Sequence, residues 1–402
     1  MNRRDFLKTG TLAAAASGLT AYGLTADGTE AHAAEPPKIK RYQEVGKTGM
    51  KISDISFGGD SIPSASMILR AVDRGINYFD TAPDYGRSES LIGEAMKNLK
   101  RDKVHIASKF CKPQGYPPHL QPGSSKNDYI TAVEDSLKRL NTSYIDVCFV
   151  HAIGTSSKDF EAEKKRLLDE NMFSAAEQLK KDGKIRFLAT SSHGPANMEP
   201  LLMEAVKSGR FDLIMASFNF LKFPKLPEVL TEAKKRGVGV IAMKTLAGAK
   251  DMSLDFKGGN FAQSSFKWVL KHKEVNGLIV TMKSVTDLDN YLPASGQEFT
   301  ASDQKVLDAY AALHGASYCR TGCNLCEEAC AKGVEIASTL RYQMYFSDYH
   351  MEKRAIISYA SLMTKAGHCS ACDGHDCTGA CPYGLPVAGM LKEAHENLTI
   401  EV

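Results

Sequence analysis

The chain has 402 residues, 43% of them hydrophobic, and its 50 Lys and Arg against 47 Asp and Glu leave a formal net charge of +3. This charge is too small to indicate a nucleic acid or an acidic membrane surface as a partner. Of the 10 cysteines, eight lie between residues 319 and 381. The C-terminal part is therefore expected to carry a chemistry of its own.

The first 33 residues resemble a twin-arginine export signal. Arg3 and Arg4 form the arginine pair, residues 11–24 are mildly apolar, and residues 31–33 (Ala-His-Ala) offer a cleavage site. The apolar stretch is too short to span a bilayer. We therefore expect residues 1–33 to be a signal peptide read by the twin-arginine translocase. The mature protein would lie in the periplasm or be otherwise exported, without stable membrane insertion. A disordered basic N-terminus is the alternative.

After a linker at residues 34–41, residues 42–312 alternate short β-branched or aromatic runs with helical patterns. The runs expected to be strands are Ile52–Phe57, Asn77–Thr81, Val104–Lys109, Ile145–His151, Ile185–Thr190, Asp212–Phe218, Val238–Met243 and Gly277–Thr281. Eight parallel units of this length predict an α/β fold of the (β/α)8 TIM barrel type. A doubly wound sheet is the alternative, but no Gly-x-Gly-x-x-Gly motif follows any of these runs.

Four polar residues stand at or near the ends of the second to fourth runs, where barrel enzymes keep their active sites. Asp80 ends the second run, Tyr85 follows it, Lys109 ends the third and His151 ends the fourth. A cation beside Tyr85 would stabilise the phenolate and lower its pKa, so Tyr85 and Lys109 predict a general acid–base pair. Asp80 would keep the lysine charged.

These segments resemble the aldo-keto reductase superfamily over nearly all of residues 42–295, and the Asp-Thr-Ala-x-x-Tyr-Gly motif at Asp80 is the most specific of them. With its C-terminal cysteines, the chain is similar to the iron–sulfur-containing aldo/keto reductases. The resemblance implies hydride transfer between NADP or NAD and a small carbonyl or alcohol substrate. It also implies that His151 donates a hydrogen bond to the substrate oxygen. The cofactor-binding residues that it implies are Ser191, Ser192, Met215, Phe218, Met243, Lys244, Leu246, Gly248, Lys283 and Ser284.

The nucleotide-binding residues depart from the pattern of the superfamily. Ser192 stands where relatives have asparagine, Met215 replaces a glutamine and Phe218 replaces a tyrosine. Asp287 and Asp289 lie where many relatives place an arginine for the 2′-phosphate of NADP. The choice between NADP and NAD therefore stays open. Some of the rim lysines could also be ordinary solvated charges.

Residues 313–402 predict a small, mostly helical ferredoxin-like domain with two [4Fe–4S] clusters. Two cysteine runs, C-x3-C-x2-C-x3-C and C-x2-C-x4-C-x3-C-P, share a tail of glycine and apolar residues, as a duplicated module would. The predicted ligands are Cys319, Cys323, Cys326, Cys330, Cys369, Cys372, Cys377 and Cys381. Disulfides and four-cysteine zinc sites are the alternatives. The dense packing of the cysteines argues against the former, and the ferredoxin-like spacing argues against the latter.

The pairing of ligands with clusters is implied by resemblance to two-cluster ferredoxins, in which the last cysteine of each run serves the other cluster. Cys330 would then join the second run and Cys381 the first. Two cysteines stand apart: Cys148 lies in an apolar strand run and is expected to be a core thiol, whereas Cys111 near the barrel mouth has no predicted role.

Together these features predict an exported oxidoreductase that interconverts carbonyl and alcohol groups, uses Tyr85 as general acid–base and is coupled to two iron–sulfur clusters. A redox partner protein would exchange electrons with the clusters. The alternative is an electron-transfer protein whose barrel is a docking or small-molecule-binding scaffold without nicotinamide turnover.

Overall fold

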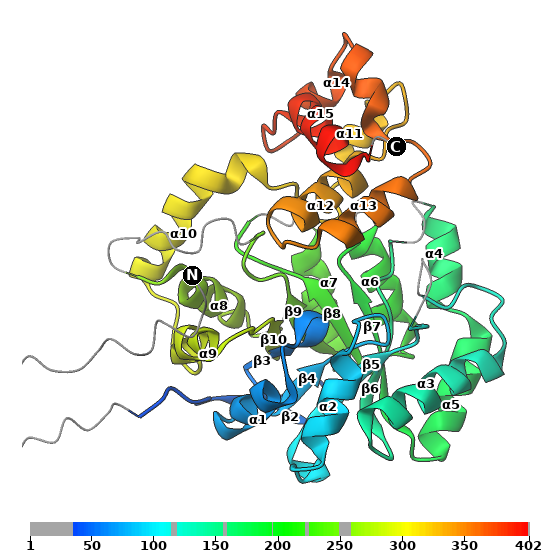
Figure 1. Ribbon diagram of the computed structural model, residues 1–402, viewed down its shortest axis with the longest axis vertical. Coiled ribbons are helices and arrows are strands. Elements are labelled where there is room, and N and C mark those ends of the chain that lie inside the picture. Colours follow the sequence, from blue (N-terminus) through cyan, green and yellow to red (C-terminus); the bar gives the residue numbers. More distant parts are fainter. Residues whose placement is uncertain are drawn as a thin grey trace, which may run out of the picture. The chain divides into compact units, whose positions relative to one another are not determined.

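A computed structural model describes residues 35–113, 119–155, 159–194, 196–221, 225–248 and 259–400 (Figure 1). The predicted signal peptide and its cleavage site lie outside these residues. From Pro36 onward the chain forms one compact unit. Within the described ranges, no helix combines the length and the apolar character that a membrane span requires.

Eight parallel strands close into a barrel in the order β10-β3-β4-β5-β6-β7-β8-β9, which confirms the predicted fold class. The strands are β3 (Ile55–Gly58), β4 (Tyr78–Asp80), β5 (His105–Lys109), β6 (Ile145–Val150), β7 (Ile185–Ser192), β8 (Leu213–Ser217), β9 (Gly239–Met243) and β10 (Gly277–Val280). They are buried almost throughout, because helices cover the outer face and side chains fill the interior. Seven of the predicted runs coincide with these strands to within two residues.

The first predicted run, residues 52–57, is wrong as a single strand. Its start belongs to β2 (Lys51–Ser53), which pairs antiparallel with β1 (Tyr42–Glu44), and the barrel strand begins only at Ile55. The buried side chain of Asp54 causes the break, because it accepts hydrogen bonds from the backbone N–H groups of Ile55 and Gly296. The hairpin then packs Ile52 against the barrel interior, beneath Tyr78 and Phe149.

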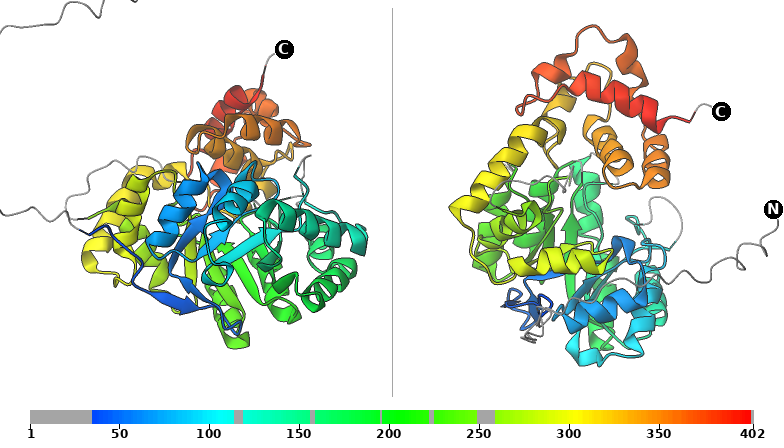
Figure 2. Two further views of the ribbon diagram at one scale, coloured as in Figure 1. Left: turned by 60° about the horizontal axis from the view of Figure 1, so that its bottom comes forward. Right: turned by 60° about the vertical axis from the view of Figure 1, so that its left-hand side comes forward.

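The helices of the barrel form its outer layer (Figure 2). They are α1 (Ala65–Asp73), α2 (Ser88–Met96), α3 (Lys126–Leu140), α4 (Phe160–Leu167), α5 (Glu170–Lys181), α6 (Met198–Ser208), α7 (Leu226–Arg236), α8 (Phe261–Leu270) and α9 (Val285–Tyr291). Local chemistry sets their ends. In α3, for example, Ser125 and Asp128 form a reciprocal capping box, and Asn141 closes the helix in a left-handed conformation with φ 49°.

The last third of the described chain is helical. Its helices are α10 (Ala301–His314), α11 (Leu325–Glu328), α12 (Ile336–Ser347), α13 (Glu352–Ala360), α14 (Asp376–Gly379) and α15 (Val387–Leu398). The mostly helical character predicted for residues 313–402 is thus confirmed for the described part of that range, and α12 and α13 lie between the two cysteine runs. These two lie over the carboxyl ends of the barrel strands (Figure 1). An aromatic cluster that includes Tyr310, Tyr318, Tyr345 and Tyr359 packs in this part of the molecule.

Candidate active site

Asp80 and Lys109 form a buried ion pair at the ends of β4 and β5. Nζ of Lys109 donates hydrogen bonds to Oδ1 and Oδ2 of Asp80 at 2.9 and 2.8 Å and to the backbone oxygen of Thr81 at 2.7 Å. An ammonium group has three N–H donors, so all of them are occupied. Burial raises the pKa of Asp80, and the charge of Lys109 opposes that rise. The pair therefore fixes one positive charge at the rim of the barrel.

Tyr85 lies beside this pair. Nζ of Lys109 is 4.7 Å from the centre of the Tyr85 ring, and the Tyr85 hydroxyl is 3.4 Å from Nε2 of His151. Burial, together with the charges of Asp80, Asp60 and Asp84, raises the pKa of Tyr85 well above its usual range. The net shift is therefore opposite to the lowering expected from a neighbouring cation, because burial and three carboxylates outweigh the positive charges around the hydroxyl. Tyr85 is a protonated phenol at neutral pH and is set up to donate a proton.

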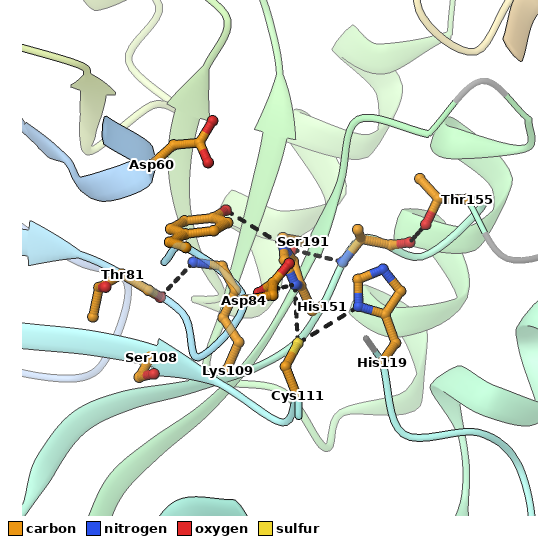
Figure 3. A network of polar contacts seen from close by, with 12 residues as sticks. Asp60, Thr81, Asp84, Ser108, Lys109, Cys111, His119, His151, Thr155 and Ser191 are labelled. Carbon is orange, nitrogen blue, oxygen red and sulfur yellow. Dashed lines mark hydrogen bonds and ion pairs between the residues drawn. The ribbon is translucent and has the colours of Figure 1, made fainter. Parts of the chain in front are cut away.

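His151 directly follows β6 and is also buried. Desolvation and the nearby cations and imidazoles lower its pKa well below the usual range, so the ring is neutral. Nδ1 is 3.1 Å from Sγ of Cys111 and 3.6 Å from Oδ1 of Asp84 (Figure 3). The four predicted catalytic residues are therefore brought together, with the Nε2 edge of His151 turned to the Tyr85 hydroxyl.

A pocket with a volume of about 460 Å³, within the size range of small-molecule sites, opens beside two of these four residues. Asp80 and Tyr85 line it together with Asp60 and residues that follow β9 and β10. The opposite wall comes from α12, α13 and the segment between them, with Tyr345, Tyr349 and Arg354. Sequence reasoning missed this wall, since no local pattern signals that these C-terminal residues meet the barrel mouth.

The predicted cofactor-binding residues divide into two groups. Met243, Lys244, Leu246 and Lys283 line the pocket. Other predicted contacts are engaged elsewhere: the Ser191 hydroxyl accepts a hydrogen bond from the backbone of Ala152, and the Ser192 hydroxyl donates one to the backbone oxygen of Ile153.

Four further predicted contacts serve packing or capping. Met215 fills the barrel interior, and the Phe218 ring lies 5.1 Å from that of Trp268. Gly248 lies against the Tyr318 ring, which a Cβ atom would approach to 2.8 Å. Ser284 caps α9.

Two groups in the pocket fit a bound nucleotide. Lys244, which is half-buried, lies 5.1 and 5.3 Å from the centres of the Tyr345 and Tyr349 rings, and within the described part of the chain no carboxylate forms an ion pair with it. A partly desolvated cation without a carboxylate partner favours an anionic group such as a phosphate. Nδ1 of His193 is buried, without a hydrogen-bond partner among the described residues. Both groups offer contacts to a ligand that carries phosphate and amide groups.

The two aspartates that stood out in the sequence have structural partners. Asp289 forms an ion pair with Arg74 at 2.8 Å. Asp287 accepts hydrogen bonds from the backbone N–H groups of Lys283 and Ser284 at 2.6 and 3.0 Å. Asp287 thereby occupies the amide donors at the start of α9, where an anion would otherwise bind.

The eight C-terminal cysteines, all of them free thiols, come together in two groups of four. One group surrounds a small cavity and consists of Cys319, Cys323, Cys326 and Cys381. In the other, burial raises the pKa of Cys369 to about 11, and the neighbouring thiols that contribute are Cys330, Cys377 and Cys372. The last cysteine of each run thus lies with the other run, in the pairing that the ferredoxin resemblance implies. Four converging thiols amid apolar side chains are a donor set that suits a cubane cluster.

The two groups are built by a structural repeat. Residues 51 positions apart adopt the same local geometry: Asn324 and His375 are left-handed, with φ 53° and 50°, just before the short helices α11 and α14. Gly333 and Gly384, with φ 64° and 65°, then lead into α12 and α15. The repeat supports the duplicated module expected from the shared tail.

Comparisons with known proteins agree with the geometry of the barrel. The sequence profile of the Aldo/keto reductase family matches residues 61–252. An L-galactose dehydrogenase from Arabidopsis thaliana is 25% identical over 309 residues, which cover 67% of this chain and 92% of that protein. A probable aldo-keto reductase from Glycine max is 31% identical over 169 residues, which cover 38% of this chain and 45% of that protein.

Solved structures share the fold. A putative aldo-keto reductase from Pseudomonas aeruginosa superposes with a TM-score of 0.53 at 23% identity, covering 68% of this chain and 98% of its own. An aldo-keto reductase from Bacillus halodurans does so with a TM-score of 0.52 at 22% identity, covering 67% of this chain and 95% of its own. About a third of this chain therefore lies outside each superposition.

Proposed function

We propose that this chain is an oxidoreductase of the aldo/keto reductase superfamily, and that it interconverts carbonyl and alcohol groups with Tyr85 as general acid–base. The observation that carries the proposal is the Tyr85 hydroxyl, which faces the pocket beside Nε2 of His151 and the buried pair of Asp80 and Lys109. A substrate oxygen placed there would meet one proton donor and one orienting imidazole.

The residues of the chain have distinct roles in this reaction. Tyr85 gives its proton to the substrate oxygen as negative charge develops on it, and takes the proton back in the reverse direction. Lys109 stabilises the phenolate that Tyr85 leaves, and Asp80 holds Lys109 in place. His151 donates from Nε2 to the same substrate oxygen. Bound nicotinamide supplies or accepts the hydride.

Lys244, Lys283 and His193 would hold this nucleotide. Asp287 already occupies the backbone donors at the start of α9 with a carboxylate, which would repel a 2′-phosphate. We therefore propose NAD rather than NADP as the nucleotide. Mass spectrometry of the natively purified protein distinguishes the two.

The two groups of cysteines are proposed to hold two [4Fe–4S] clusters, which exchange single electrons. Tyr318 and Arg341 connect the first group with the pocket. Tyr318, Cys319 and Arg341 line one small cavity, and α12, which carries Arg341, also carries Tyr345 of the pocket wall. Burial raises the pKa of Tyr345, but Lys244, Arg341 and Arg354 outweigh it and lower that pKa to about 8. This continuity supports electronic coupling between the clusters and the barrel.

If the two parts are coupled, chemically reduced protein should convert a carbonyl substrate without added NADH or NADPH, and any nucleotide should copurify and exchange slowly. Anaerobic stopped-flow would follow the bleaching of the cluster absorbance and the formation of product together. The Cys319→Ser variant, which should lack the cluster next to the pocket, is the control and should lose this coupled turnover. Turnover that depends on added nucleotide alone, with clusters that reoxidise only with an external acceptor, would show that the two parts work separately.

Export by the twin-arginine route is proposed from the first 33 residues. It fits a protein that is loaded with its clusters in the cytoplasm, where thiols are reduced, and then moved in the folded state. Replacing Arg3 and Arg4 by lysine should leave the protein in the cytoplasm with its signal uncleaved, as cell fractionation and N-terminal sequencing would show. Lysine keeps the charge, so the comparison tests the arginine pair itself. Undiminished export of the double variant would contradict this route.

A second candidate is an electron-transfer protein that uses the barrel as a scaffold. It is favoured by Ser191, Ser192, Met215 and Phe218, whose side chains are engaged in the protein itself. Since a nicotinamide exported with the protein cannot be exchanged freely outside the cytoplasm, a scaffold without nucleotide would also fit the predicted location.

A further inference from the structure

We propose that Cys111, His119, His151 and Asp84 bind a divalent transition-metal ion of the zinc type at the substrate end of the barrel mouth. This site is separate from the cysteines of the C-terminal helices, and the carbonyl chemistry proposed above does not require it. It would assign a role to Cys111, for which the sequence suggests none.

The potential ligand atoms converge on one small volume (Figure 3). Sγ of Cys111 is 3.1 Å from Nδ1 of His151 and 3.5 Å from Nδ1 of His119, and Nδ1 of His151 is 3.6 Å from Oδ1 of Asp84. One ligand atom each from Cys111, His119 and His151 all lie within 4.8 Å of one another. In tetrahedral zinc sites, bonds of about 2.0–2.3 Å place neighbouring ligand atoms roughly 3.3–3.7 Å apart. The spacings from Cys111 to the two imidazole nitrogens lie close to these values. Asp84 approaches His151 but is not among the three residues whose ligand atoms converge within 4.8 Å, so its carboxylate would have to shift toward the ion to become the fourth ligand.

The hydrogen bonding of these groups is incomplete without a cation. Oδ1 of Asp84 is buried and has no hydrogen-bond partner among the described residues. The thiol of Cys111 is only a weak donor, and it faces two imidazole nitrogens. The strong donors nearby are engaged elsewhere: Lys109 binds Asp80, and Arg166 binds Glu163 at 2.7 Å. A metal ion would satisfy the sulfur, the nitrogens and the carboxylate oxygen at once.

The charges also fit a dication. A Cys111 thiolate and an ionised Asp84 would together neutralise it. The nearby cations, Lys109, Arg166 and Arg354, are each paired with a carboxylate of their own. Thiolate and imidazole ligands select zinc or a similar transition metal over calcium or magnesium, which prefer oxygen ligands.

The ion would fix the orientation and the tautomer of the His151 ring. Metal bound at Nδ1 leaves the ring proton on Nε2, which is the nitrogen 3.4 Å from the Tyr85 hydroxyl. His151 would then be held as a hydrogen-bond donor toward the substrate oxygen, in one tautomer and one orientation.

The test uses the full mature chain with its clusters intact, dialysed against Zn²⁺ and then against metal-free buffer. Elemental analysis should show about one zinc per chain, and X-ray absorption at the zinc edge should show one sulfur and otherwise nitrogen and oxygen ligands. Replacing a residue that only hydrogen-bonds to a metal ligand typically lowers metal affinity by about 10–100-fold. Cys111→Ala and His119→Ala each remove a ligand itself, so each should lower zinc affinity by more than that. Cys148→Ala, which removes a buried thiol of β6 outside the site, should keep the zinc.

His119 lies ten residues after the end of β5 and is only partly buried, so its replacement by alanine should disturb folding less than that of the buried Cys111. The His119→Ala variant therefore still tests the site if Cys111→Ala misfolds. A zinc shell of four sulfurs would place the metal in the C-terminal cysteines and overturn the proposal. So would zinc that is retained in His119→Ala, or a wild-type chain that binds none. In that last case the Cys111 thiol would only donate a hydrogen bond to His151.

Discussion

Replacement of Tyr85 by phenylalanine is expected to slow carbonyl reduction by about 10²–10⁴-fold, the usual contribution of a positioned acid or base. The variant loses only the hydroxyl that faces the pocket, and the ring remains beside Lys109. Nucleotide and substrate binding should therefore be nearly unchanged. Steady-state kinetics with a panel of small aldehydes and ketones would show a fall in kcat at similar KM.

Tyr78→Phe is a matched control for this experiment. Tyr78 is fully buried and stands on β4, and its hydroxyl has no hydrogen-bond partner among the described residues. Its removal should leave turnover unchanged, which separates loss of the acid from a general effect of deleting a buried hydroxyl. If Tyr85→Phe keeps full turnover, the barrel does not use Tyr85, and the scaffold function becomes the better account.

The second large effect concerns iron content. Anaerobically purified protein is expected to hold about eight iron and eight sulfide per chain, from two four-iron clusters with four thiolates each. The tertiary grouping predicts which pairs of substitutions act on the same cluster. Cys330→Ser combined with Cys369→Ser should remove about four iron, because both thiols belong to one group. Cys319→Ser combined with Cys330→Ser should remove about eight, because these neighbours in sequence lie in different groups.

Iron and acid-labile sulfide analysis of these double variants distinguishes the grouping from one in which each run holds its own cluster. In that case, Cys319→Ser with Cys330→Ser would cost only one cluster. Cys148→Ser is the control and should keep all the iron, since Cys148 is a core thiol of β6. Stoichiometric zinc in place of iron, without a brown chromophore, would contradict the cluster proposal itself.

Local patterns were enough to predict the barrel and the placement of its tetrad. Strand-then-helix periodicity is a property of short segments, and parallel closure brings the carboxyl ends of all strands to one rim. Asp80, Lys109 and His151 could therefore be expected to meet, although they come from different strands. The proposed cysteine ligands were also predicted from local features, namely their spacing within each run and the repeated glycine.

Other properties depended on groups that are distant in sequence. The break at Asp54 arises because its carboxylate binds Ser295 and Gly296. The raised pKa of Tyr85 follows from its burial among carboxylates, including Asp60 on a separate loop. Tyr345 and Arg354 reach the pocket from helices far along the chain, and His119 meets Cys111 only where the chain returns to the barrel mouth. The solvation of a group, the charges near it and the distances between possible metal ligands depend on all the residues packed around it, including those far away in sequence. Only the packed tertiary structure could decide them.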